Sequence, residues 1–412
     1  MRILHINNVS YASVTDQVIK PLMASLEENG YANQFFSPDS LAHGSLGDKM
    51  IHKLQRMKVF VEKSLRRIVS NNDYYFYNLF ERISFLSAKR ILKHTDTPDV
   101  IILYWISGIV NAKTIRKLQQ KTGARILMYP MDMAMLTGGC HYFWDCTGYQ
   151  RNCEQCPALK KTFRFLASSN FKFKRQQFSL TQIEMITGTL TNMKQLQQST
   201  LFGRSNINYM PVGINENIFL PSPKLVDATA PRRILIGASS LLDRRKGIHL
   251  LLAALKKMEV SDSRIGKLEL VIIGSNGSDI FNDIKIPKVY LGFVNQEGLI
   301  SAFQSAHCFI CPSIEDAGPM MINQSLMCGT PVLAFKNGVA IDVVINRETG
   351  FIAAEKTEDA LLDALMELLA MPEHIYSKMR ANCRDVAMRV NSLPIATDRL
   401  IKILKSEHQN LY

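Results

Sequence analysis

The sequence predicts an α/β protein made of two domains, each built on a doubly wound parallel sheet. Strand-like and helix-like segments alternate along residues 2–129, and the same rhythm restarts at residue 232. Such alternation is typical of parallel sheets covered by helices on both faces. The 412 residues are enough for two separate hydrophobic cores. A proline-rich, polar stretch at residues 220–231 divides the two runs and marks the expected boundary.

The individual elements follow from short apolar patterns. Buried strands are expected where apolar residues run together, and helices where they recur at helical spacing. The expected strands are residues 2–6, 32–36, 99–104, 125–129, 233–236, 268–273, 288–291, 307–311 and 331–335, and the expected helices are residues 17–28, 112–121 and 248–258. Residues 392–412 are expected to form a terminal helix. Ligands of such sheets bind beyond the carboxyl ends of the strands.

Composition narrows the class of protein. Apolar residues make up 47% and charged residues 21%, as in ordinary soluble proteins. The longest apolar run, residues 100–110, is too short to span a bilayer. A strand that begins at residue 2 leaves no room for a signal peptide, so we expect a cytoplasmic protein. The net charge of +13 is compatible with an anionic membrane or phosphorylated substrates, whereas the absence of a nucleic-acid-binding motif disfavours nucleic acid.

Residues 312–335 carry the most informative pattern, which reads as a strand end, an acidic loop, a short helix and a buried strand. Gly318 lets the backbone approach a ligand, and Pro319 suits the first position of the helix. A helix N-terminus beside a strand end favours an anion such as phosphate, and Glu315 and Asp316 can hold hydroxyl groups. A site for phosphate and polyol together suggests a nucleotide sugar. The alternative is an ordinary α/β turn.

This segment resembles the donor-site signature of retaining GT-B glycosyltransferases of family 4. Aligned on residues 328–331, the first acidic position of the signature is Asp316 and the second is Gln324, where Glu is usual. The resemblance implies that Asp316 contacts the transferred sugar and that Gln324 holds the donor ribose, by hydrogen bonds without charge. It also implies two Rossmann-like domains that face each other across a cleft.

The implied division assigns residues 1–220 to the acceptor and residues 231–390 to the nucleotide-sugar donor, with a helix at residues 391–412 that crosses back to the first domain. Residues 211–219 resemble the segment that closes the first domain. Residues 137–142 resemble a subgroup of exopolysaccharide and colanic-acid-type transferases.

Further residues extend the resemblance. Residues 243–247 look like the family's basic phosphate-binding turn, in which Lys246 matches the family lysine. The usual arginine is Leu241 here, so Arg244 or Arg245 is expected to replace it. The implied catalytic residues are Asp316, Lys246 and Arg245, and the implied donor-binding residues are Arg244, Gly274, Gly292, Phe293, Gly318, Pro319, Met320, Met321 and Gln324.

Two departures concern the first domain. Residues 7–15 lack the glycines that usually follow the first strand of the family, so no donor contact is assigned there. Asp132 aligns with a His-Asp pair near the sugar, but the histidine is replaced by Met131. We predict that Asp132 contacts the acceptor or the sugar, with a purely structural acid as the alternative.

Four cysteines stand close together within an insert near residues 137–160. Four soft ligands in this spacing can enclose a tetrahedral zinc, and Cys-x2-Cys is typical of zinc knuckles. Such a site would be structural because four thiolates leave no position for a substrate. Free thiols are an alternative, and disulfides are disfavoured in a reducing compartment. The cysteines are Cys140, Cys146, Cys153 and Cys156.

Residues 52–70 form a basic amphipathic pattern, in which Met57, Val61, Leu65 and Ile68 recur at helical spacing among lysines and arginines. Such a helix suits an anionic bilayer surface. The alternative is a solvated helix whose apolar stripe packs on the first domain.

The leading hypothesis is therefore a retaining glycosyltransferase that moves a sugar from a nucleotide-sugar donor to a glycan or lipid-linked glycan during cell-surface polysaccharide assembly. No Asp-x-Asp triplet is present, so we expect protein groups without a catalytic metal to stabilise the leaving group. The alternatives are a non-catalytic sugar-nucleotide-binding scaffold, and a hydrolase, epimerase or phosphorylase of the same fold. A zinc-dependent nucleic-acid module is a third class.

Overall fold

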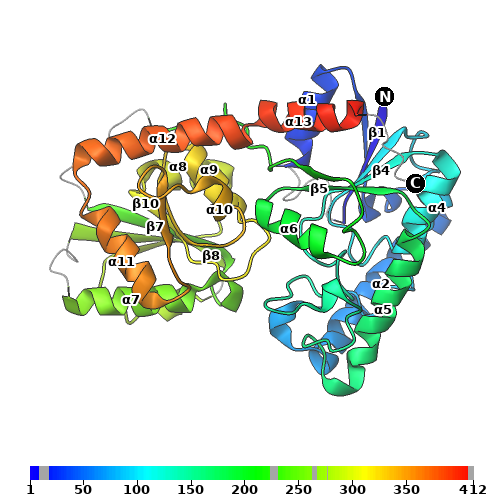
Figure 1. Cartoon of the computed structure of the whole chain (residues 1–412), viewed down its shortest axis with the longest axis horizontal. Coiled ribbons are helices and arrows are strands. Elements are labelled where there is room, and N and C mark those ends of the chain that lie inside the picture. Colours follow the sequence, from blue (N-terminus) through cyan, green and yellow to red (C-terminus); the bar gives the residue numbers. More distant parts are fainter. Residues whose placement is uncertain (9–17, 223–230, 262–266, 276, 407–412) are drawn as a thin grey trace. The chain divides into compact units, whose positions relative to one another are not determined.

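The computed structural model describes residues 1–8, 18–222, 231–261, 267–275 and 277–406. The chain divides into two compact units (Figure 1). Unit 1 comprises residues 1–188, 192–210 and the chain from Thr397 onward, and unit 2 comprises Thr189–Thr191 and Pro211–Ala396. Each unit contains one six-stranded sheet, which confirms the predicted α/β class with two parallel sheets.

The sheet of unit 1 has the strand order β2-β1-β3-β4-β5-β6, and every neighbouring pair is parallel. The inner strands β1, β3, β4 and β5 are almost entirely buried, as expected for a parallel sheet, whereas the edge strands β2 and β6 are partly exposed. The strands are β1 (Arg2–Ile6), β2 (Ala32–Phe36), β3 (Val100–Leu103), β4 (Arg125–Met128), β5 (Ile183–Thr187) and β6 (Ile207–Tyr209). The helices are α1 (Ile19–Glu28), α2 (Leu46–Val69), α3 (Ala88–Ile91), α4 (Ala112–Thr122), α5 (Arg164–Phe178) and α6 (Leu190–Gln198).

The ends of α4 illustrate how local sequence sets an element. Asn111 caps the start, because its side-chain oxygen accepts a hydrogen bond from the Thr114 amide at 2.9 Å. Gly123 ends the helix with φ of 67°, a left-handed conformation that glycine adopts without a steric penalty. Between these ends, Ile115 and Leu118 are buried. The expected helix at residues 112–121 is therefore confirmed.

The sheet of unit 2 has the order β12-β11-β10-β7-β8-β9 and is also parallel throughout. Strand β7, the first of the unit, lies between β10 and β8 near the centre of the sheet, as in doubly wound folds. The strands are β7 (Arg232–Ser240), β8 (Leu268–Ser275), β9 (Lys288–Gly292), β10 (Cys308–Cys311), β11 (Val332–Phe335) and β12 (Gly350–Ala353). The helices are α7 (Ile248–Ser261), α8 (Gln296–Ser305), α9 (Met320–Met327), α10 (Ala340–Val343), α11 (Glu358–Leu369), α12 (Glu373–Asn391) and α13 (Leu393–Lys405).

The boundary between the units lies before the proline-rich stretch. Ile214 and Phe219 belong to the hydrophobic core of unit 2, and the Ile214 amide donates to the Asn391 carbonyl at 2.8 Å. The chain therefore enters unit 2 at Pro211, because these apolar side chains already pack there. Residues 223–230 of the expected boundary lie outside the described residues. The second boundary falls inside α13, between Ala396 and Thr397.

None of the helices in the described part of the chain is long and apolar enough to cross a bilayer. Cys308 and Cys311, which stand in the expected strand at residues 307–311, are both buried in β10 as core residues.

Candidate functional site

The predicted donor residues lie on loops at neighbouring strand ends of unit 2. Strands β10, β7, β8 and β9 are consecutive in the sheet and run in the same direction, so their carboxyl ends form one edge. Lys246 follows β7 and Asp316 follows β10, whereas Gly274 is the second-last residue of β8 and Gly292 is the last residue of β9. This edge is where ligands of doubly wound sheets bind.

The turn after β7 is held in a shape that only glycine permits. Asp243 caps a 3₁₀ turn at Arg244–Lys246 by accepting a hydrogen bond from the Arg245 amide at 3.0 Å. Gly247 closes the turn with φ of 65°. A Cβ at this position would lie 1.8 Å from the Pro312 carbonyl oxygen. The loops after β7 and β10 therefore touch backbone to backbone, and this contact fixes Lys246 in position.

Lys246 and Asp316 form an ion pair in which the ammonium and carboxylate groups are 2.5 Å apart. Both side chains are mostly buried, with 20% and 10% of their surfaces exposed. A backbone hydrogen bond of 2.8 Å from the Ile314 amide to the Arg245 carbonyl joins the two loops. The structure thus places the predicted phosphate-binding cation beside the predicted sugar-binding carboxylate.

The two arginines that were expected to replace the family arginine differ in environment. Arg245 is buried, and its guanidinium contacts the Asp243 carboxylate at 2.5 Å and the Glu315 carbonyl at 3.4 Å. Arg244 is exposed at the surface of the same turn. Arg245 therefore helps to shape the loop, whereas the Arg244 guanidinium has access to a ligand. Leu241 is buried in the core of unit 2.

The ends of β8 and β9 combine close backbone approach with an exposed aromatic ring. Gly274 has φ of 145°, and a Cβ there would lie 2.1 Å from the Ala238 carbonyl oxygen. Gly292 has φ of 64° and open space around its Cα. Phe293 is 81% exposed. A flat apolar ring beside an open strand end can stack against a nucleotide base.

Helix α9 begins one residue later than predicted, at Met320, because Pro319 has ψ of 107° and acts as the N-cap. The first amides of a helix, here those of Met320 and Met321, have no acceptor within the helix, so they are available to an anion. The Gly318 amide donates to the Asp316 carboxylate at 3.2 Å. Gln324 is buried on the inner side of α9.

In unit 1, Asp132 pairs with a histidine that the sequence analysis did not connect to it. The His141 Nδ1 lies 2.7 Å from Asp132 Oδ2, and Asp132 Oδ1 accepts from the Ala134 amide at 2.8 Å. Both residues are buried at the carboxyl side of β4. Residue 131 is a methionine, but His141 of the same irregular loop lies beside Asp132 instead. The residues next to Asp132 and His141 in the sequence do not indicate this pairing, because only the path of the loop brings the two side chains together.

Aromatic rings surround this histidine. Tyr77 packs edge to face on His141 with ring centroids 4.5 Å apart, and Trp105 packs similarly at 6.2 Å. His141 Nε2 and Trp105 Nε1 are buried and have no hydrogen-bond partner among the described residues. Tyr75 packs on Tyr77 with ring centroids 6.0 Å apart, whereas Phe76 between them is buried in the core. A sugar hydroxyl both donates and accepts, so it can satisfy such nitrogens.

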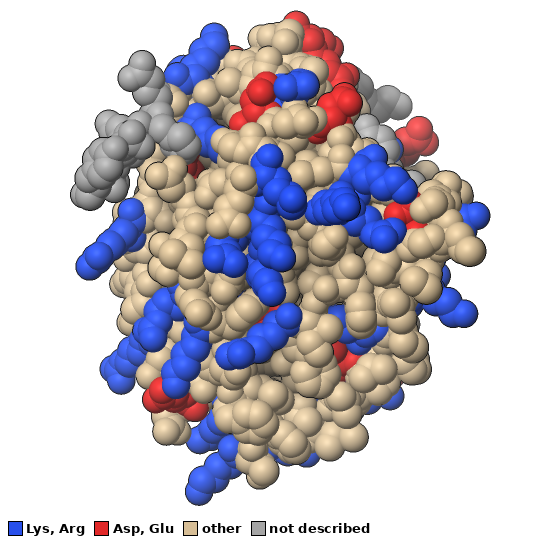
Figure 2. Space-filling model, turned by 90° about the vertical axis from the view of Figure 1, so that its right-hand side faces the viewer, with Lys and Arg blue, Asp and Glu red and all other residues tan. Residues whose placement is uncertain are grey.

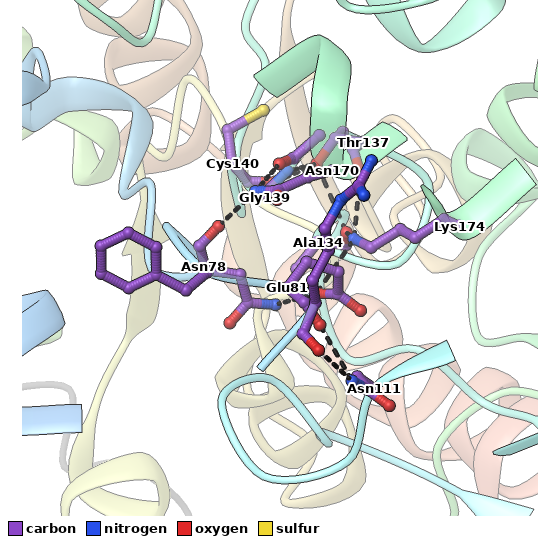
Figure 3. A network of polar contacts seen from close by, with 12 residues as sticks. Asn78, Glu81, Asn111, Ala134, Thr137, Gly139, Cys140, Asn170 and Lys174 are labelled. Atoms are coloured by element: carbon purple, nitrogen blue, oxygen red, sulfur yellow. Dashed lines mark hydrogen bonds and ion pairs between the residues drawn. The ribbon is translucent and has the colours of Figure 1, made fainter. Parts of the chain in front are cut away.

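A network of buried polar side chains fixes the loop that carries Asp132 and His141 (Figure 3). Lys174 on α5 donates to the carbonyls of Ala134 at 2.7 Å and Thr137 at 3.0 Å, and lies 3.8 Å from Glu81. Asn170, one turn earlier, donates to the Gly138 carbonyl at 3.1 Å. The side chains of α5 therefore donate hydrogen bonds to loop carbonyls that have no partner in regular secondary structure.

The four cysteines of the insert line one small cavity of about 10 Å³. None of the four forms a disulfide with another described cysteine, and burial raises the pKa of Cys153 to about 12 and of Cys156 to about 11. The Gly148 amide donates to the Cys146 sulfur at 3.3 Å. Within the described ranges, no group of three or more His, Cys, Asp or Glu side chains has the arrangement of a metal site. Zinc binding by these cysteines stays a prediction from the sequence.

The structure describes the first two residues of the loop after β1, Asn7 and Asn8. Asn8 donates to the Ser107 carbonyl at 2.8 Å, and the Trp105 amide donates to the Asn7 side chain at 3.1 Å. Residues 9–15 of the glycine-free segment lie outside the described residues.

A comparison with protein-family models finds a similarity in the part of the chain that carries Lys246 and Asp316. Residues 228–388 match the family model described as "Glycosyl transferases group 1". The matched segment lies within unit 2 and includes Lys246 and Asp316. No curated protein sequence matches the chain.

Solved structures match the whole chain in fold. Sucrose-phosphate synthase from Thermosynechococcus elongatus is 15% identical, with a TM-score of 0.65 and 98% of each chain covered. A glycosyltransferase from Rickettsia africae is 15% identical, with a TM-score of 0.64, and 98% of this chain and 99% of that chain are covered. Anabaena HepE in complex with UDP and glucose is 12% identical, with a TM-score of 0.61, and 99% and 100% are covered. At these identities the likeness shows the fold, which is GT-B.

Proposed function

We propose that the chain is a retaining glycosyltransferase that transfers a sugar from a nucleotide-sugar donor to a glycan or lipid-linked glycan acceptor. The observation that carries the proposal is the Lys246–Asp316 pair, which lies within the segment that matches the family model of group 1 glycosyl transferases. A cation and a carboxylate in contact suit a ligand that has phosphate next to sugar hydroxyls. The bound UDP and glucose in the solved structure of HepE support a donor of this class.

The chain's own residues have distinct roles in this proposal. Lys246 and the first amides of α9 hold the diphosphate and stabilise the negative charge that develops as the sugar leaves. Asp316 accepts hydrogen bonds from hydroxyls of the transferred sugar and orients it. Phe293 stacks on the base, and the amide of Gln324 bonds to the ribose without charge. Arg245 keeps Asp243 and the loop in place, and Arg244 pairs with phosphate. The reaction needs no metal ion.

The proposed setting is cell-surface polysaccharide assembly, such as exopolysaccharide, capsule or O-antigen. The protein would work as a peripheral protein on the cytoplasmic face of the membrane, where lipid-linked acceptors present their sugars. The net charge of +13 supports this setting, because lipid-linked acceptors carry phosphate and sit among anionic lipids.

Transfer is tested by incubating the protein with nucleotide sugars and a lipid-linked glycan, and by determining the anomeric configuration of the product. The proposal expects a product that keeps the configuration of the donor sugar, formed in the presence of a chelator. An inverted product would contradict the proposed stereochemistry. Release of free sugar without transfer, at a rate that the acceptor does not change, would favour a hydrolase. Donor binding without any turnover would favour a scaffold.

A further inference from the structure

The side of helix α2 that faces the rest of unit 1 carries mostly polar residues. Its buried residues are Asp48, Gln55, Glu62 and Val69, which follow one another at steps of seven. Residues seven apart lie on one side of a helix, so these four define its inner side. An ordinary amphipathic helix buries an apolar stripe instead.

Specific partners fix this orientation. The Asp48 carboxylate contacts the Arg90 guanidinium at 2.5 Å and the His94 ring at 3.3 Å. Gln55 donates to the Gly108 carbonyl, and the Phe80 amide donates to Glu62 at 2.9 Å. Rotation of the helix about its axis would break these bonds and leave buried polar groups without partners, which is costly. The inner side of α2 is therefore set by polar contacts.

The outer side of α2 carries large apolar residues. Leu46, Met50, Met57, Val61 and Ile68 are separated by four and seven residues in turn, so they form one stripe, and Phe60 lies beside it. Between 43% and 86% of each of these six residues is exposed. The alternative of an apolar stripe that packs on the first domain is thus wrong for Met57, Val61 and Ile68. A continuous apolar stripe of this size on a surface marks an interaction site.

A stripe of cations runs along the apolar stripe. All five cations are exposed, whereas both acids of the helix, Asp48 and Glu62, are buried. Figure 2 shows the side of the molecule on which α2, α4 and α5 lie in Figure 1, with Lys and Arg spread over it and few Asp or Glu among them. The cations of the stripe are Lys49, Lys53, Arg56, Lys63 and Arg67.

A neighbouring segment extends this surface beyond the end of α2. The Lys160 amide donates to the Val69 carbonyl at 2.9 Å, which holds the segment beside the last turn of the helix. Lys160 and Lys161 are exposed, and Phe165 is 62% exposed. We name the outer side of α2 together with residues 160–165 the α2 surface.

We propose that the α2 surface is the contact of this protein with an anionic lipid bilayer. The apolar stripe enters the boundary between headgroups and acyl chains, and the cations pair with lipid phosphates. A second copy of the chain is a poor occupant, because a two-fold contact would bring two identical cationic stripes together. The inference rests on the proposed function for its biological purpose, since it places the protein where lipid-linked acceptors are found.

The test is flotation of the full-length protein with vesicles of phosphatidylcholine, with and without phosphatidylglycerol. A charge variant, Lys53→Glu with Lys63→Glu, removes two cations, each of which contributes about fivefold to binding at low salt. An apolar variant, Met57→Ser with Phe60→Ser, removes side chains that have little contact with the protein. The matched control, Lys378→Glu with Arg389→Glu on α12, makes the same charge change at exposed positions of unit 2.

We expect the wild type and the control to float with anionic vesicles and to be released by salt. The charge variant should bind at least about 25-fold more weakly, and the apolar variant should lose binding as well. The inference is overturned if the wild type does not float, or if both α2 variants float as well as the control. It is also overturned if light scattering shows a dimer that the apolar variant converts to monomer, since a second copy would then cover the surface.

Circular dichroism and the thermal midpoint of each variant show whether it is folded. Nucleotide-sugar binding is measured on the same samples, because the donor residues lie in unit 2 and the α2 surface lies in unit 1. A variant that loses flotation but still binds the donor would show that its substitutions affect the α2 surface alone. Absent donor binding in the wild type with normal flotation overturns the proposed function and leaves the membrane contact standing.

Discussion

The two units fix the loops at their strand ends by different means. In unit 2, backbone packs directly on backbone at glycines: a Cβ at Gly247 would lie 1.8 Å from the Pro312 carbonyl oxygen, and one at Gly274 would lie 2.1 Å from that of Ala238. In unit 1, buried polar side chains hold the loop that carries Asp132, and Lys174 donates to two of its carbonyls. Unit 2 thus depends on steric fit, and unit 1 depends on satisfied charge and hydrogen bonds.

This difference shows which kind of change each unit tolerates. A loop held by glycines accepts changes of exposed side chains, because its shape is set by the backbone. A loop held by a buried cation depends on that single side chain, because removal leaves an uncompensated carboxylate and two unpaired carbonyls. The predictions below test the contrast in order of expected effect.

The largest effect on stability is expected from Lys174→Met in unit 1. Lys174 is fully buried beside Glu81, and breaking such a pair costs about 3–5 kcal/mol. Lys172→Met on the same helix removes an exposed ion pair with Glu154 and should cost less than about 1 kcal/mol. Urea unfolding measures both. Equal free energies of unfolding for the two variants would refute the role of Lys174, and addition of Glu81→Gln should recover part of its loss.

The next effect is on catalysis and belongs to unit 2. Lys246→Ala should lower kcat about 10²- to 10³-fold, because it removes a positioned cation from the leaving diphosphate. Lys256→Ala, which changes an exposed lysine of α7 in the same unit, should leave kcat unchanged. Initial rates of transfer measure both. A Lys246→Ala enzyme within about threefold of the wild type would show that another group holds the phosphate.

Acid should destabilise both units through buried histidines. Burial lowers the pKa of His5 in unit 1 to about 4 and of His307 in unit 2 to about 3. Below the ordinary value of about 6.5 the unfolded chain takes up these protons first, so stability falls as the pH falls. Between about pH 6.5 and about pH 5 the loss should be about 2 kcal/mol for His5 alone.

Unfolding in urea at these two pH values measures this loss. His5→Gln and His307→Gln should each make the dependence shallower. An unchanged dependence in both variants would contradict neutral buried histidines.

A smaller effect is expected at the Asp132–His141 pair. His141→Asn removes the 2.7 Å bond and leaves Asp132 buried, which should cost about 1–3 kcal/mol. If the pair also contacts the acceptor, the variant should raise the KM for acceptor and leave the KM for donor unchanged. His374→Gln at an exposed position of α12 is the control. Thermal unfolding and two-substrate kinetics separate the two roles. A variant with wild-type stability and kinetics would show that the pair does neither.

The smallest effect on turnover is expected from the cysteine insert. If the predicted zinc is present, metal analysis should find it in about equimolar amount to the protein, and it should be lost in Cys156→Ser but kept in Cys383→Ser. A chelator should lower the thermal midpoint without a direct effect on the transfer step, because such a site is structural. Purified protein without zinc, and with an unchanged midpoint after chelation, would leave four free thiols as the correct alternative.

The sheets and the loops at their strand ends could be predicted because residue type itself carries the constraint, whereas the donor contacts of these loops stay a prediction. Gly247 and Gly274 adopt backbone conformations that other residues rarely adopt, and the strands expected at residues 2–6 and 32–36 are confirmed as β1 and β2. The start of α9 was predicted one residue early, since Pro319 caps the helix from outside it. The first residue of a helix depends on the backbone dihedral angles at its end, and residue type alone does not determine these angles.

The arrangement of unit 1 could not be predicted to the same depth. The Asp132–His141 pair depends on an irregular loop, and Lys174 reaches this loop from a helix far along the chain. The outward direction of the apolar stripe on α2 depends on partners of Asp48 and Glu62 that lie on other elements. Helical spacing shows that a stripe exists, but only tertiary contacts decide which side of the helix is buried.

Thermal unfolding in the presence of UDP-, GDP-, ADP- and CMP-sugars, without added metal, tests the central claim most directly. A ligand that binds only the folded protein at a hundredfold excess over its Kd stabilises it by about 2.7 kcal/mol. We predict that nucleotide sugars of one base raise the midpoint, that Lys246→Ala abolishes the rise, and that Lys256→Ala keeps it. No rise with any of the sugars, or a rise that survives Lys246→Ala in full, would contradict a donor site at Lys246 and Asp316.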